Sequence, residues 1–444
     1  MSNDRLKRYV ILFWGLSVVL LIVLIATGTL ARLSRMSLPS AFAAQQNLSG
    51  LESTSTPFQP DGNVTGVDGN LSLPTSTALD GMTPTPGIIV EQPFGGYATD
   101  TPPAQVRVYG VAPNSLPSDI DPLTGLRPDN PDLLDRRPIA IKITLFPRYS
   151  REWMSGLSMA DVAYEYYIED GLTRYIALFY GNNPDRVGGV RSGRYFDEHI
   201  MRMYHSYLVF ANADERVENY LLDSDLLHFL VVSRPDNCPP MCRDKSIQDY
   251  NNFFFDAVYF QDWLAKRGKD NSRQDLRPTL FSQLPPVPND TATRIYTRYS
   301  SYSYNYWDYD PQTNKYLRFQ ETHDTLDGRS QEYAPLFDHL TNQQITADNV
   351  VMLYVQHRFA NHFDEEDQVY HIDLLGSGKA YVFRDGVVIP ANWWRVGMDQ
   401  PLVLTDPAGN PLPLHTGQTF YEVIGDTSTS NQVGDEWYFQ WKIP

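Results

Sequence analysis

The chain has 444 residues, of which 42% are hydrophobic and 20% are charged. It can therefore bury a substantial core, and it is too long for a single ordinary domain. Its 36 basic and 53 acidic residues give a formal net charge of -17 at pH 7. Because such a surface repels nucleic acid, we expect no nucleic-acid partner.

The first predicted element is a membrane anchor. Residues 9–30 form an apolar run without a charged residue, long enough as a helix to cross a hydrocarbon core of roughly 30 Å. Arg5, Lys7 and Arg8 precede this run, and such basic clusters tend to stay in the cytoplasm. The sequence predicts a single-pass protein of the cytoplasmic membrane, with a basic tail at residues 1–8 inside and the C-terminal domains outside.

A cleaved signal peptide is the alternative interpretation of this N-terminal segment. Ala41-Phe42-Ala43 has the small residues of a cleavage site, but it lies well past an apolar run that exceeds the usual length of about 7 to 15 residues. We therefore favour a retained anchor. No cysteine follows the run before Cys238, so we expect no lipid on an N-terminal cysteine.

A tether and two folded regions follow the anchor. Residues 31–105 are rich in Ser, Thr, Pro and Gly and poor in charge, which predicts a disordered linker. A second Pro-rich and charged stretch at residues 267–290 indicates an interdomain linker. We therefore expect one domain at residues 106–266 and another at residues 291–444.

The first folded region alternates strand and helix patterns. It predicts strands at residues 137–143, 161–168 and 172–180, and helices at residues 195–208 and 217–230. Asp170-Gly171 between two strands is a strong hairpin signal. As a two-residue turn, this pair would place Arg174 opposite Tyr167. The region is predicted to be α/β.

The second region is predicted to be a mainly antiparallel β domain. Its apolar runs are short and separated by Gly, Asp and Pro turns. The predicted strands are residues 349–357, 368–374, 379–383, 402–405 and 420–424.

Several ordered phrases of the chain are similar to one known family. They are Asp121-Pro-Leu-Thr-Gly-Leu126, Ser155-Gly-Leu-Ser-Met-Ala-Asp161, Val187-Gly-Gly-Val-Arg-Ser-Gly-Arg194, Gly376-Ser-Gly378, Trp393-Trp-Arg395 and His415-Thr-Gly-Gln-Thr419. They resemble the YerB-like family of bacterial envelope lipoproteins, which carries a domain of unknown function (DUF3048) in N- and C-terminal parts. The resemblance implies an extracytoplasmic location and a two-domain plan. It supplies no catalytic residue.

This chain also departs from the family pattern. Relatives carry a Pro-His-Asn stretch near the position of Cys238-Pro-Pro-Met-Cys242 in this chain. A role that depends on that histidine therefore cannot be carried over.

The segment from Arg186 to Arg194 is the strongest candidate binding site. Glycines allow close backbone approach, and arginines beside a predicted helix N-terminus favour an anion such as a phosphate or a carboxylate. With Arg174, the predicted ligand-binding site would include Arg191, Ser192 and Arg194, together with Glu165 and Glu169. The alternative is that the arginines pair with Glu165, Glu169 or Asp197 to hold the domain together.

Glu165 and Glu169 suggest a glycosidase, but their spacing does not support one. Four residues of strand span about 13 Å, whereas catalytic carboxylates lie roughly 5 to 9.5 Å apart. Cross-strand pairing with Arg174 is the favoured interpretation.

Tyr302, Tyr304 and Tyr306 alternate along the chain, so a strand would place three rings on one face. Such a row could stack on sugar rings, but we favour cross-strand packing.

Cysteine and histidine give weaker signals. Cys238 and Cys242 are the only cysteines, and outside the cytoplasm they could form a short-loop disulfide or remain free thiols. His357, His362 and His371 flank the acidic stretch 364–367 without matching a metal-site spacing. We expect no metal and no cofactor.

These patterns favour a non-catalytic envelope protein that binds an anionic or glycan ligand through its arginines. Two alternatives stay open: a cell-wall hydrolase or transferase that uses Glu165 or Glu169, and a structural module that binds a protein partner. The sequence specifies no particular protein partner.

Overall fold

The computed structural model describes residues 116–276, 279–287, 289–360 and 369–442. The predicted anchor at residues 9–30 and the predicted linker at residues 31–105 lie outside these ranges. Among the described residues, no helix is both long enough and apolar enough to span a bilayer.

The first region mixes strands and helices, as predicted. Its strands are β1 (Ile139–Thr144), β2 (Val162–Tyr167), β3 (Thr173–Phe179), β4 (Val187–Gly188), β5 (Tyr207–Phe210), β6 (Leu230–Val232), β7 (Met241–Arg243) and β8 (Phe253–Phe255). Its helices are α2 (Phe196–Tyr204), α3 (Glu215–Leu222) and α4 (Phe260–Lys266), with 3₁₀ turns at Pro131–Asp135, Arg148–Glu152, Leu157–Met159, Leu227–Phe229 and Pro235–Asn237. Strands β1, β2 and β3 are buried at every position, so both of their faces are covered.

The two predicted helices of the first region, α2 and α3, end earlier than predicted. After α2 the backbone turns at His205, whose φ is 47°, and the last residues of the predicted helix begin β5. After α3, the Ser224 hydroxyl donates to the Leu221 carbonyl and accepts from the Leu226 amide, which forms a turn in place of another helical turn. Apolar spacing continued through both segments, but local hydrogen bonds ended the helices.

The predicted hairpin is present with a different register. Strands β2 and β3 pair antiparallel, with Tyr167 opposite Thr173 and Arg174 opposite Tyr166. The loop therefore has three residues, because Ile168 and Leu172 are still hydrogen-bonded across it. Arg174 consequently points to the face opposite the one that the two-residue turn predicted.

The second region is mainly β, as predicted. Its strands are β9 (Asp290–Thr291), β10 (Arg294–Arg298), β11 (Tyr304–Asp310), β12 (Lys315–Glu321), β13 (Tyr333–Pro335), β14 (Thr346–Ala347), β15 (Asn349–Val355), β16 (His357–Phe359), β17 (Tyr370–Ile372), β18 (Gly376–Arg384), β19 (Val387–Arg395), β20 (Val403–Thr405), β21 (Thr419–Gly425), β22 (Thr429–Val433) and β23 (Glu436–Gln440). The pairs within this region are antiparallel except β15 with β21 and β10 with β23.

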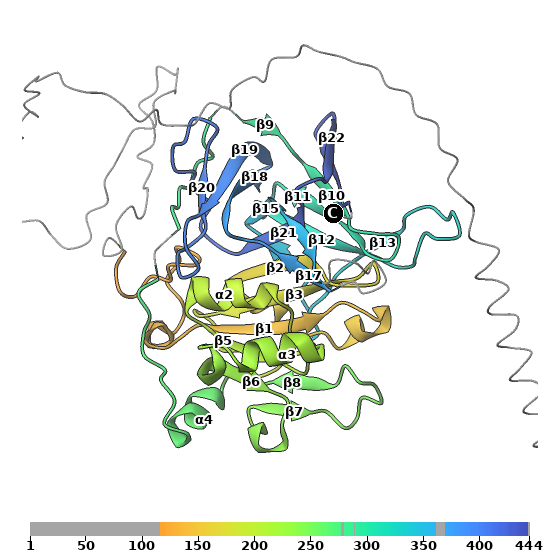
Figure 1. Cartoon of the computed structure of the whole chain (residues 1–444). Coiled ribbons are helices and arrows are strands. Elements are labelled where there is room, and N and C mark those ends of the chain that lie inside the picture. Colours follow the sequence, from red (N-terminus) through yellow and green to blue (C-terminus); the bar gives the residue numbers. More distant parts are fainter. Residues whose placement is uncertain (1–115, 277–278, 288, 361–368, 443–444) are drawn as a thin grey trace, which may run out of the picture. The chain divides into compact units, whose positions relative to one another are not determined.

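One large sheet joins the two regions. Within the described residues its order is β20-β19-β18-β15-β21-β2-β3-β1-β5-β6, and β9 pairs with β19 (Figure 1). The junction is the parallel pair β2–β21, which places Glu165 beside Glu422. Strands from both sides of the predicted linker at residues 267–290 therefore share one hydrogen-bonded sheet.

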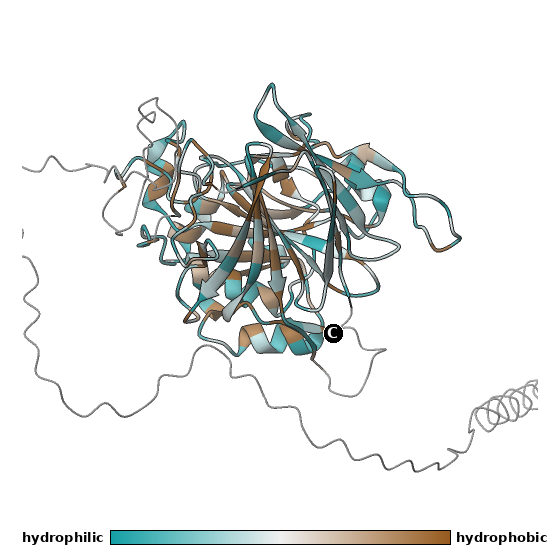
Figure 2. Cartoon of the chain, turned by 90° about the horizontal axis from the view of Figure 1, so that it is seen from above, coloured by the Kyte–Doolittle hydropathy of each residue, from teal (hydrophilic) through white to brown (hydrophobic). Residues whose placement is uncertain are grey.

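Packing around the large sheet follows the hydropathy of its strands. Hydrophobic residues are concentrated along the central strands, and many connecting loops are hydrophilic (Figure 2). Ile141, Val351 and Val423 are fully buried there. Helix α2 covers one face of the large sheet, where Phe196 contacts Tyr164 and Tyr166 of β2.

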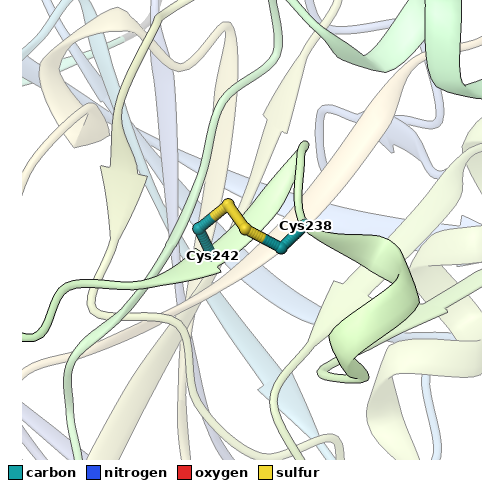
Figure 3. The surroundings of a disulfide bond; sticks show 2 residues. All are labelled: Cys238 and Cys242. Carbon is teal, nitrogen blue, oxygen red and sulfur yellow. A yellow bond between two sulfur atoms is a disulfide. The ribbon is translucent and has the colours of Figure 1, made fainter.

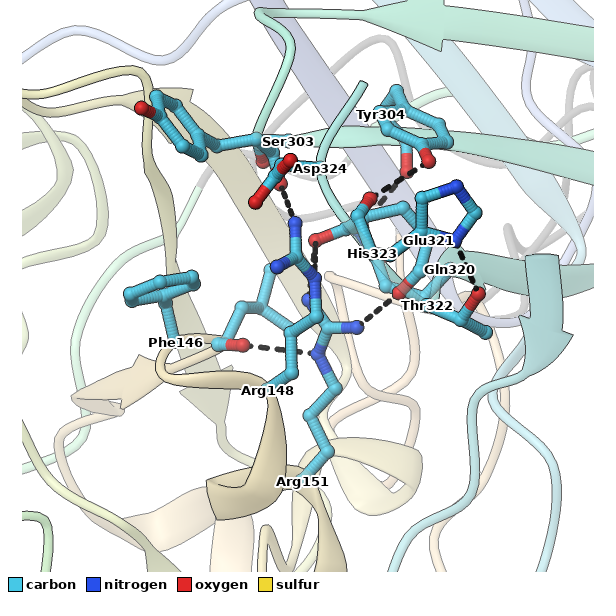
Figure 4. Close-up of polar contacts among 12 residues, drawn as sticks. Phe146, Arg148, Arg151, Ser303, Tyr304, Gln320, Glu321, Thr322, His323 and Asp324 are labelled. Atoms are coloured by element: carbon cyan, nitrogen blue, oxygen red, sulfur yellow. Dashed lines mark hydrogen bonds and ion pairs between the residues drawn. The ribbon is translucent and has the colours of Figure 1, made fainter. Parts of the chain in front are cut away.

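A second sheet has the order β13-β12-β11-β10-β23-β22, with β14 paired to β12. Two arginines of the first region contact Glu321 at the end of strand β12 in this sheet (Figure 4). Arg151 bonds to the carboxylate of Glu321 at 2.5 Å, and Arg148 lies 3.7 Å from the same carboxylate. These contacts are among several electrostatic links between the regions.

Candidate functional site

Four cations from three separate segments form a cluster on the α2 side of the large sheet. Lys142 comes from β1, Arg174 from β3, and Arg191 and Arg194 from the loop between β4 and α2. Arg174 and Arg194 help to lower the pKa of Lys142, and Arg194 also helps to lower the pKa of Arg174 and of Arg191. We call these four residues the cationic cluster.

Two carboxylates pair directly with the cluster. Arg194 donates to both oxygens of Glu169, with a distance of 2.9 Å from Nε, and Arg174 lies 3.8 Å from the same carboxylate. Lys142 lies 3.0 Å from Asp197, which also accepts from the hydroxyl of Tyr166. The predicted structural pairing is therefore present for Arg194.

The cluster nevertheless holds more positive than negative charge. Asp249, near Arg191, and Asp214, near Arg194, are two further acids in electrostatic range. Asp214 is already paired with Arg216, at 2.9 Å, so the four cations of the cluster face Glu169, Asp197 and Asp249. Burial, with repulsion from Arg194, lowers the pKa of Arg174 to about 9. Burial also lowers the pKa of Lys142 to about 8, against the attraction of Asp197. The neighbourhood consequently favours additional negative charge.

Two donors of the cluster are unused. Among the described residues, Arg174 Nη1 and Arg191 Nε are buried and have no hydrogen-bond partner. The guanidinium of Arg191 lies 4.5 Å above the ring of Tyr250, which is 56% exposed. Since a buried donor without a partner costs free energy, these two N–H groups are where a ligand oxygen would be accommodated.

The glycine loop has a different role from the one that the sequence predicted. A Cβ at Gly189 would lie 2.4 Å from the Asn251 carbonyl, and one at Gly188 would lie 2.6 Å from the Phe253 carbonyl. The two glycines thus allow the backbone carbonyls of Asn251 and Phe253 to approach closely, instead of a ligand. At the start of α2, Asp197 already accepts from the Arg194 amide at 2.7 Å. An anion would therefore be held by arginine side chains and not by the helix N-terminus.

Ser192 lies at the edge of this group. Its hydroxyl donates to the side chain of Asn212 at 3.2 Å, and the residue is 9% exposed. It fixes the loop that carries Arg191 and Arg194.

Glu165 is separated from the arginines by the sheet. Because side chains alternate along strands, Glu165 and its partner Tyr175 face away from Arg174. Glu165 accepts from Thr173 at 2.6 Å and from Arg318 at 2.5 Å, and Arg318 also donates to Glu422 at 2.5 Å. All three members of this Glu165–Arg318–Glu422 triad are at most 1% exposed.

The buried triad should make stability depend on pH. Burial, with the nearby Glu422, raises the pKa of Glu165 to about 7 from an ordinary 4.5. The folded state then keeps a proton on Glu165 that the unfolded state releases. The contribution of Glu165 to the free energy of unfolding therefore falls as the pH rises from about 4.5 to 7. Urea unfolding of wild type and Glu165→Gln at several pH values measures it. Between pH 4.5 and 7 the free energy of unfolding of the wild type should fall relative to that of Glu165→Gln as the pH rises. A difference between the two proteins that does not change with pH would contradict the assignment.

The tyrosine row serves packing. Tyr306 stacks on Phe319 at 4.6 Å, and Tyr296 stacks on Tyr438 at 4.7 Å, with interplanar angles of 8° and 5°. Because the rings cover each other's faces, they offer mainly edges to a ligand. Tyr302 precedes β11 and is not part of this row.

Cysteine and histidine positions complete the predicted candidates. Cys238 and Cys242 form a disulfide (Figure 3). His357 Nδ1 lies 2.9 Å from the Val355 carbonyl, and His371 stacks on Tyr195 at 4.2 Å. His362 and the acidic stretch 364–367 lie outside the described residues.

Comparison with known proteins identifies the class of this chain. It belongs to the family described as "Protein of unknown function (DUF3048)": the N-terminal domain of that family matches residues 123–270, and its C-terminal domain matches residues 295–421. The predicted family resemblance is confirmed.

A relative in sequence and a similar solved structure are both reported for YerB of Bacillus subtilis. The chain is 23% identical over 316 residues to "Putative lipoprotein YerB" of Bacillus subtilis (strain 168), which covers 70% of this chain and 87% of that protein. The crystal structure of YerB from Bacillus subtilis matches with a TM-score of 0.55 at 22% identity, covering 69% of this chain and 96% of that chain. At this identity the structural match establishes the fold.

Several residues of these networks were missed by sequence reasoning. Lys142 gave a usable signal, because a lysine in the otherwise uncharged strand Ile139–Thr144 requires a buried partner. Arg318 and Glu422 gave only weak signals, since each lies in a strand whose pairing the sequence did not define.

Proposed function

We propose that this chain is an envelope protein, anchored by residues 9–30, that binds an anionic group of an extracytoplasmic ligand at the cationic cluster without catalysing a reaction. The observation that carries the proposal is the excess positive charge of the cluster together with its two unused buried donors. The location draws support from the relative that is named a lipoprotein.

The chemistry of the cluster suits an oxyanion. Guanidinium groups present N–H donors in a planar fork that matches carboxylate and phosphate oxygens. Arg191 is partly exposed beside Tyr250, so it can receive a ligand from solvent, whereas Arg174 lies deeper. A phosphate or carboxylate of a wall polymer would gain the donors that the chain leaves unpaired.

Neither Glu165 nor Glu169 is suited to act as the general acid that the enzymatic alternative requires. Glu165 is buried on the opposite face of the sheet. Although burial works against it, Arg194 and Arg174 keep the pKa of Glu169 below its usual value, so this side chain stays ionised and cannot donate a proton at neutral pH. A binding role therefore fits the two carboxylates better than hydrolysis does.

Ligand-induced stabilisation tests the proposed function. We expect pyrophosphate to raise the thermal midpoint of the full chain in detergent by about 5 °C relative to sodium chloride of equal ionic strength. In Arg191→Gln the rise should fall by half or more. This variant should keep its fold, because Arg191 makes no ion pair in the described part of the chain.

Arg267→Gln is the matched control, since its guanidinium also lies over a ring, that of Trp263 at 4.3 Å, outside the cluster. An equal pyrophosphate response in wild type and Arg191→Gln would exclude the cluster as the binding site.

A further inference from the structure

A pocket of about 470 Å³ lies at one end of the large sheet, in the second region. It is lined where β15 ends, where β18 begins, and by the turn that follows β21, and its walls include Tyr354, Ser377 and Ser428. Its volume falls in the range of roughly 300 to 1,000 Å³ that is typical of small-molecule sites. It shares no lining residue with the cationic cluster.

Two motifs from the sequence meet in the wall of this pocket. Gly378 of the Gly-Ser-Gly motif pairs in register with Trp393 of the Trp-Trp-Arg motif. A Cβ at Gly378 would lie 2.5 Å from Trp393 Nε1, and that nitrogen donates to the Tyr354 carbonyl at 2.8 Å. The glycine therefore lets the indole cross the strand and fix the wall.

Four polar side chains that line the pocket are unused in the described part of the chain. Within the described residues, the side chains of Gln356, Ser377 and Asp426 make no hydrogen bond, and the buried hydroxyl oxygen of Ser428 has no partner. Among the residues that the structure describes, the ammonium of Lys379 makes no ion pair and lies 5.0 and 4.6 Å from the ring centres of Tyr354 and Tyr381. Polar groups in a concave site without internal partners are available to a ligand.

The charges of the pocket are balanced. Asp373 is neutralised by Arg358, at 2.5 Å, which leaves one cation, Lys379, and one anion, Asp426. A balanced site gives no advantage to an anion or to a cation. It does offer both donors and acceptors, and a hydroxyl group can use both.

We infer that this pocket binds a neutral, hydroxyl-rich saccharide unit. Each ligand hydroxyl can accept from Lys379 or Ser428 and donate to Asp426 or Gln356, while the exposed Leu375 covers an apolar ring edge. The inference is independent of the anion site and places a second, chemically different contact on the same chain. Together, the two sites would suit a polymer that carries sugars and acidic groups.

Calorimetric titration of the full chain with chitotetraose, a neutral saccharide, tests the inference. A polyoxyethylene detergent is required, because a glycoside detergent would compete. We expect Asp426→Ala and Lys379→Ala each to weaken binding about tenfold, since each removes a charged hydrogen-bond partner. Both residues are exposed, so the variants should keep the thermal midpoint of the wild type, and Lys266→Ala in α4 is the matched control.

Filling the pocket gives a second test. Ser377 is exposed, and Ser377→Trp should abolish binding without unfolding the chain. Absence of chitotetraose binding in the wild type, or equal affinity in all pocket variants, would overturn the inference. Binding of a zwitterionic dipeptide in place of chitotetraose, lost in the same variants, would also overturn it and assign the pocket to a zwitterion.

Discussion

Arg318→Ala is expected to lower the free energy of unfolding by about 3 to 5 kcal/mol. Arg318 is completely buried and donates to Glu165 and Glu422, which lie side by side on β2 and β21. Without it, two carboxylates would face each other in a medium that cannot solvate them. Chemical unfolding followed by tryptophan fluorescence measures the loss.

The matched control is Arg294→Ala, which removes an arginine from an ion pair with Asp308 at 2.8 Å whose side chains are 35% and 34% exposed. Solvent screening limits this loss to about 1 kcal/mol or less. If Arg318→Ala does not fold, Arg318→Met combined with Glu165→Gln and Glu422→Gln should restore folding, because it removes all three charges. A loss from Arg318→Ala no larger than that of the control would contradict the role of the triad.

Separation of the two regions is expected to unfold the first one. A chain of residues 106–270 lacks β21, the parallel partner of β2, and also lacks Arg318, the partner of Glu165. It would expose a strand edge and leave a buried carboxylate unpaired. We therefore expect no cooperative thermal transition by calorimetry for this fragment.

Addition of residues 271–444 in trans is the complementary measurement. Since the missing strand and arginine are then supplied, a cooperative transition should return. A cooperative transition of residues 106–270 alone would show instead that the two family domains are independent folding units, as the sequence predicted.

Strand positions were predictable because apolar content and turn residues are local signals. β1, β3, β15 and β21 all lie within predicted ranges to within a residue or two. Helix ends were less predictable, since the positive φ of His205 ends α2 and the hydrogen bonds of the Ser224 hydroxyl end α3, and apolar spacing encodes neither. The pairing of β2 with β21 joins segments more than 250 residues apart, and no local pattern specifies it.

The candidate site was predictable only in part for the same reason. Arg191 and Arg194 are close in sequence, so their motif was visible. Arg174 was also predicted as part of the site, whereas Lys142 was not. Whether these two side chains meet the motif depends on the register of three strands, and one residue of hairpin slip decides which face Arg174 occupies. That register also separates Glu165 from the arginines, which the sequence had placed in one group.

Anomalous diffraction from crystals of the protein soaked in selenate tests the central claim most directly. We predict a selenium peak whose oxygens lie about 3 Å from Arg174 Nη1 or Arg191 Nε, the donors without a partner in the described part of the chain. Selenate bound elsewhere on the protein, with none at the cationic cluster, would contradict the proposed anion site.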